Sequence, residues 1–98
     1  MPRAEIEFHP DAIFEAKSAH EWYATRSEQA AVAFMAELDR AVGAISEGPD
    51  RWPSYLHGTR RFLMRRFPFL VVYRKIPTGF EIVAVAHAKR RPGYWKSR

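Results

Sequence analysis

The sequence contains no cysteine, which excludes disulfide bonds, thiolate metal sites and a cysteine nucleophile. Its four histidines do not show the paired spacing of zinc ligands, and we expect neither a metal nor another cofactor. No hydrophobic run approaches the roughly 20 residues of a membrane span. Residues 1–7 do not form the apolar core of a signal peptide, so we expect a cytoplasmic protein. The histidines are His9, His20, His57 and His87.

Acidic residues are almost missing from the second half of the chain. Residues 51–98 hold twelve Lys or Arg against one acid, Glu81, for a net charge of +11. Residues 1–50 hold ten acids against four bases, for a net charge of −6. A half-chain with this imbalance repels itself unless its charges spread apart or meet an anion. Nucleic acid is the first candidate for that anion, and an acidic protein is the second.

The length of 98 residues is that of one domain, which we expect to span residues 1–98. Alternation at residues 4–8 predicts a short strand that pairs with a later strand. A helix is expected from His9-Pro10-Asp11 onward, and a second helix begins after Ser27 and ends at Gly48-Pro49. Three strands at residues 60–66, 69–76 and 80–87 then form an antiparallel meander, followed by a basic and aromatic tail at 88–98. The predicted fold class is α+β, in which one sheet includes the first strand and covers a two-helix hairpin.

The apolar patterns predict which side chains form the core. In the first helix the stripe is Ala12, Ala16, Ala19 and Tyr23, and in the second it is Ala31, Phe34, Leu38, Ala41, Val42 and Ile45. Alternation in the last strand places Phe80, Ile82, Ala84 and Ala86 on one face and Glu81, Val83, Val85 and His87 on the other. We expect Trp22 and Trp52 to be packing residues, and Glu81 to bond a neighbouring arginine.

Two stretches carry a family resemblance. Residues 67–73 read FPFLVVY, and the motif AVAH at 84–87 is followed by RRPGYW at 90–95. The chain resembles the RelE/ParE superfamily of bacterial type II toxins over nearly its whole length. The resemblance implies a sheet on a helix hairpin and an acidic antitoxin that wraps the toxin. It also implies a target in an essential process, because RelE-like members cut mRNA in the ribosome and ParE-like members poison DNA gyrase.

The nuclease alternative requires a base for a 2′-hydroxyl, a cation for the scissile phosphate and an acid for the leaving oxygen, without a metal. RelE-like members have an arginine just before the central LVY segment, where this chain has Leu70. By the resemblance, their later basic residues correspond loosely to Lys89, Arg90 and Arg91, and their aromatic residue to Tyr94 or Trp95. His87 is a possible base because imidazole titrates near neutrality.

Three functions follow from these patterns. The first is a ParE-like toxin that inhibits gyrase by binding, favoured by the missing arginine at position 70. The second is a metal-independent, ribosome-dependent mRNA endonuclease, and the third is a non-toxic basic binding module. The candidate catalytic residues are His87, Arg90 and Tyr94; the candidate residues for binding the target or the antitoxin are Arg60, Arg61, Arg65, Arg66, Arg74, Lys89, Arg91 and Trp95. The competing expectations are that His87 only bonds at a strand end and that Tyr94 and Trp95 only pack the tail.

Overall fold

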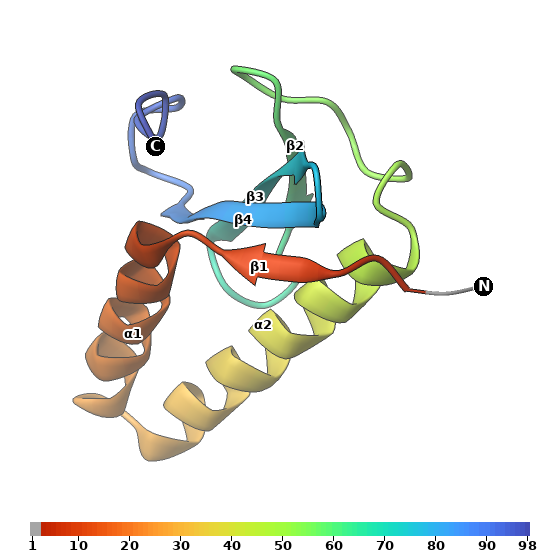
Figure 1. Cartoon of the computed structure of the whole chain (residues 1–98). Helices are drawn as coiled ribbons and strands as arrows, with labels where there is room; N and C mark the ends of the chain where they lie inside the picture. The colour runs from red at the N-terminus through yellow and green to blue at the C-terminus, as the bar shows by residue number, and fades with distance from the viewer. Residues whose placement is uncertain (1–2) are drawn as a thin grey trace.

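The computed structural model describes residues 3–98 and places a four-stranded sheet against a hairpin of two helices (Figure 1). The α+β fold expected from the sequence is confirmed. Two predicted strands are longer than those observed, since the first covers three residues and the second stops at Leu63. The predicted strand at 69–76 is confirmed, and the last strand begins one residue earlier than predicted. The elements in order are β1 (Ile6–Phe8), α1 (Pro10–Ala24), α2 (Glu28–Glu47), β2 (Arg60–Leu63), β3 (Phe69–Ile76) and β4 (Gly79–His87).

The strand order in the sheet is β1-β4-β3-β2. Strands β2, β3 and β4 form the predicted antiparallel meander. Strand β1 adds to β4 in parallel, with Ile6 opposite Phe80 and Phe8 opposite Ile82, so the sheet is mixed. The first and last strands therefore meet, and α1 leaves β1 directly beside the end of β4.

Both helices begin with the caps that the sequence predicts. The Nδ1 atom of His9 accepts a hydrogen bond from the Asp11 N–H at 3.0 Å, and Pro10 follows as the first helical residue. The hydroxyl of Ser27 accepts from the Ala30 N–H at 3.2 Å at the start of α2. Satisfying these otherwise unpaired amides fixes where each helix begins.

The main core lies between the helices and one face of the sheet. Phe34 of α2 is its centre, with ring centroids 5.5 Å from Tyr23, 5.5 Å from Phe67 and 5.3 Å from Phe69. The predicted stripes of both helices face this core. Trp52 joins it through Phe62. Trp22 packs edge-on against Tyr23 at 5.1 Å but stays 52% exposed, so it lies at the margin of the core.

A second, smaller core covers the opposite face of the sheet. Trp95, 2% exposed, packs there on Val72, Val83, Ala84 and Ala86. Tyr55 of the long loop and Tyr94 of the tail flank its indole. The tail is therefore folded against the sheet, and both faces of the sheet are covered.

A bulge in β4 overturns the predicted alternation. Val72 pairs with Ala84 and Tyr73 pairs with Ile82, so Val83 is an extra residue on β4. Phe80, Ile82 and Val85 consequently face the helices, while Ala84 and Ala86 join Val83 on the other side. The expected common face of Phe80, Ile82, Ala84 and Ala86 was wrong, because one inserted residue reverses every side chain beyond it.

Candidate functional site

The tail returns to α1 and β4 and is held there by the carboxylate of Glu15. This side chain is only 10% exposed, although it sits in the middle of α1. Its oxygens accept hydrogen bonds from the Tyr94 hydroxyl at 2.6 Å, from Arg98 at 2.9 and 3.0 Å, and from Arg90 at 3.3 Å. They also accept from the Val85 backbone N–H at 2.9 Å. One buried carboxylate thus organises three side chains of the tail.

Sequence reasoning assigned no such role to Glu15. The available signal was its position within the stripe of small residues that α1 turns to the core, between Ala12 and Ala19. A carboxylate there needs donors, because a buried charge without partners is costly. The donors are unpredictable from local pattern, since Val85, Tyr94 and Arg98 lie 70 to 83 positions away.

The Glu15 carboxylate raises the pKa values of two groups that it binds, Tyr94 and Arg98. Burial raises the pKa of the Tyr94 phenol above its ordinary value, and the hydrogen bond to Glu15 raises it further. The hydrogen bond to Glu15 also raises the pKa of Arg98. At neutral pH the phenol is protonated and donates a hydrogen bond to the Glu15 carboxylate. This bond turns the Tyr94 hydroxyl toward α1.

The predicted catalytic residues occupy neighbouring but differently engaged positions. His87 ends β4, where its Nδ1 accepts from the Lys89 N–H at 3.0 Å and its ring lies 5.1 Å from that of Phe69. The Arg90 guanidinium stacks on the Tyr94 ring at 3.6 Å. His87 and Arg90 line one end of an open groove of about 710 Å³, whose apolar walls include Phe14, Trp22 and Phe69.

A family model now decides the assignment. The model of the "ParE toxin of type II toxin-antitoxin system, parDE" matches residues 6–92. The chain belongs to the ParE toxin family.

A solved structure described as the chromosomal ParDE TA system from P. aeruginosa has the same fold. It superposes with a TM-score of 0.77 over 89% of this chain and 98% of the other, at 14% sequence identity. None of the curated proteins matches the sequence significantly.

In this ParE-family chain the predicted binding residues divide into engaged and exposed cations. Arg60 donates to the carbonyls of Trp52 and Asp50, at 2.6 and 3.3 Å, and Arg74 pairs with Glu81 at 2.8 Å, which confirms the expected partner of Glu81. The exposed members, which form no salt bridge within residues 3–98, are Arg61, Arg65 and Arg66 around the end of β2 and Lys89 and Arg91 in the tail.

A chain of aromatic contacts runs across the outer face of the sheet from Arg61 to Arg90. Arg61 lies 5.0 Å over the Tyr55 ring, and the Tyr55 and Trp95 rings are 5.4 Å apart. The Trp95 and Tyr94 ring centroids are 5.4 Å apart, and the Arg90 guanidinium stacks on the Tyr94 ring. Trp95 itself is buried, so its contribution to the site is to pack the tail on the sheet.

Two features are absent from the described part of the chain. Within residues 3–98 no group of histidines and carboxylates has an arrangement that holds a metal ion. Neither helix of that part of the chain combines the length and apolar character that a bilayer crossing demands.

Proposed function

We propose that this chain is a toxin that acts by binding DNA gyrase in the cytoplasm and trapping its complex with cleaved DNA. The observation that carries the proposal is the internal engagement of Arg90 and Tyr94 by Glu15. A nuclease needs a cation aimed at the scissile phosphate and a group that exchanges protons near neutral pH. Here Arg90 is paired with a carboxylate, and the Tyr94 hydroxyl donates a hydrogen bond to the same carboxylate at 2.6 Å.

Position 70 points in the same direction. Leu70 is partly buried against the small core on the outer face of the sheet, at the place where RelE-like enzymes have an arginine. Arg90, which lines the same groove as His87, is paired with the Glu15 carboxylate at 3.3 Å. His87 alone supplies a proton acceptor without the phosphate clamp that cleavage requires.

The partner that neutralises the toxin is an acidic antitoxin. Arg61, Arg65 and Arg66 surround the end of β2, which is an edge strand and carries Leu63 at 65% exposure. We expect antitoxin carboxylates to meet these guanidinium groups, since complementary charge speeds association and selects the partner. Arg60 and Arg74, already engaged within the domain, contribute less.

The experiment compares two cell-free reactions containing the purified chain. In a supercoiling assay with gyrase, the chain should lower the activity and accumulate cleaved DNA. In a translation reaction, the reporter mRNA should remain intact, and the His87→Ala variant should inhibit gyrase as well as the wild type does. Codon-located mRNA cuts that disappear in His87→Ala, together with unaffected gyrase, would establish the nuclease instead. Activity in neither reaction would favour the non-toxic binding module.

A further inference from the structure

The edge of β4 beyond β1 is closed by side chains instead of by a strand. Within residues 3–98, strand β1 pairs only with Phe80, Glu81 and Ile82, so the next residues of β4 have no strand from the described part of the chain on that side. The Val85 N–H donates to Glu15, and the Val83 carbonyl accepts from Arg98 at 3.0 Å. A carboxylate and a guanidinium thereby satisfy the edge groups that another strand would pair.

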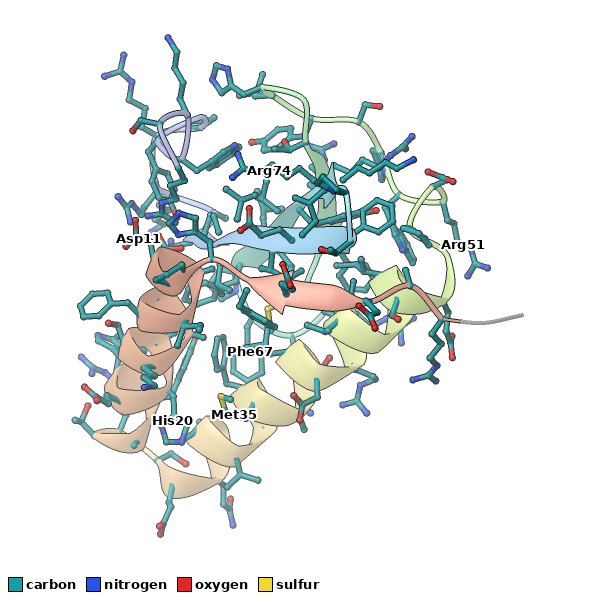
Figure 2. All side chains as sticks on the ribbon, viewed as in Figure 1. Asp11, His20, Met35, Arg51, Phe67 and Arg74 are labelled. Atoms are coloured by element: carbon teal, nitrogen blue, oxygen red, sulfur yellow. The ribbon has the colours of Figure 1, made fainter. Side chains whose placement is uncertain are left out.

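The tail is fixed at two separate points. Trp95 is buried on the outer face of the sheet, and Arg98 reaches the β4 edge, where its Nε also lies 3.5 Å from the Asp11 carboxylate. Figure 2 shows Asp11 at the start of α1, next to the returning C-terminal segment. Turns closed by Lys96 N–H to Gly93 O and by Arg98 N–H to Trp95 O shape the segment between these points. Arg90 and Arg98 pair with Glu15, although Arg90 remains 53% exposed. Three other cations of the tail are exposed and have no carboxylate partner within residues 3–98: Lys89, Arg91 and Lys96.

We propose that Glu15 is the positioning residue that sets which cations the tail presents to the target. It pairs with Arg98, whose side chain is largely covered, and with Arg90, which stays 53% exposed, and it leaves Lys89, Arg91 and Lys96 as the unpaired cations of the contact surface. This inference rests on the proposed function for its target, but the shape of the tail is tested separately. Glu15 touches no target group, and its effect is transmitted through the side chains that it holds.

The Glu15→Gln variant tests this role with little change in volume. It removes the negative charge between the guanidinium groups of Arg90 and Arg98. It also replaces an acceptor by an amide group whose N–H atoms cannot accept from these donors, so the hydrogen bonds that hold the tail are weakened. Hydrogen bonds to charged groups are strong enough that amide exchange at Val85 and residues 93–98 should become roughly 10- to 100-fold faster. Exchange of amides in the middle of α2 should change much less. The matched control is Glu21→Gln on the same helix, whose exposed side chain forms no salt bridge within the described part of the chain.

Gyrase inhibition provides the second measurement. The concentration of Glu15→Gln needed for half-inhibition should rise at least about tenfold, comparable to the loss of one charged hydrogen bond, while Glu21→Gln should match the wild type. Combining Glu15→Gln with a stabilising Gly43→Ala change in α2 separates positioning from stability. Gly43 has no atom within 4 Å of an added Cβ, and alanine favours the helix. The combined variant should regain stability without regaining inhibition.

Each outcome decides the proposal. Unchanged exchange at Val85 and in the tail of Glu15→Gln would overturn it whatever gyrase does. Faster exchange with inhibition within twofold of the wild type would also overturn it, as would full recovery of inhibition by Gly43→Ala. If the wild type itself leaves gyrase unaffected, the proposed function and the target role of Glu15 fail together. The exchange measurement would then still decide whether Glu15 holds the tail.

Discussion

Replacing Phe34 by alanine is expected to remove a large share of the stability of the domain. The side chain is fully buried and contacts three other aromatic rings, from α1, from the segment before β3 and from β3 itself. Truncating such a residue costs about 3–5 kcal/mol, because apolar burial is lost and the rigid neighbours leave a cavity. Domains of this size are stable by about 5–15 kcal/mol, so the variant should approach the limit of folding.

Phe14→Ala is the matched control. It removes the same atoms from α1, but its ring is 70% exposed on the wall of the open groove. Its free energy of unfolding should stay within about 0.5 kcal/mol of the wild type, as for most surface substitutions.

Urea unfolding followed by tryptophan fluorescence measures both variants. With a slope of about 1–3 kcal/mol per molar urea, Phe34→Ala should lower the midpoint by roughly 2 M, and Phe14→Ala by less than about 0.5 M. Equal losses in the two variants would refute the assignment of the core face of α1 and α2. So would a Phe34→Ala midpoint within about 0.5 M of the wild type.

Three further predictions concern pH, the turn before β4 and the tail. Burial raises the pKa of Tyr73 to about 12, so between pH 10 and 12 the unfolded chain loses a proton that the folded chain keeps. The contribution of Tyr73 to stability, fully present below pH 10, should therefore fall by roughly 2–3 kcal/mol across this window, and a Tyr73→Phe variant should show a shallower fall in alkaline urea titrations. Gly79→Ala should destabilise the domain, because Gly79 has φ of 147° and an added Cβ would collide with the Glu5 carbonyl, whereas Gly43→Ala should stabilise it by about 1 kcal/mol in thermal unfolding. Arg91→Ser should weaken gyrase inhibition and reduce its dependence on salt without changing the melting temperature, and an unchanged salt dependence would remove Arg91 from the contact surface.

The sequence predicts the elements of this fold well where a pattern is local. The stripe through Phe34 and Leu38, the cap at Ser27 and the stop at Gly48 each follow from residues within a few positions, and the structure confirms them. The α+β fold follows from the order of these elements, although the residues alone left the direction of β1 open and the structure makes it parallel to β4.

What the sequence does not predict depends on contacts between distant residues. No residue next to Val83 in the sequence indicates that it is an extra residue, because the bulge is defined only by how β4 pairs with β3. The role of Glu15 depends on the tail, and the exposure of Trp22 depends on where α1 meets its neighbours. The roles assigned to His87 and to the exposed arginines and lysines remain predictions. The cell-free reactions with His87→Ala test His87, and Arg91→Ser tests one of the tail cations.

The pairing of β1 with β4 also governs the order in which this molecule takes shape during synthesis. Ile6 leaves the ribosome long before its partner Phe80 exists, so the first strand waits for almost the entire polypeptide. Contacts between such distant positions slow assembly. The acidic half of the chain is therefore made first and stays without its sheet until the basic half follows. A nascent chain interrupted before β4 has no completed sheet and no ordered tail, so both form only when synthesis is nearly finished.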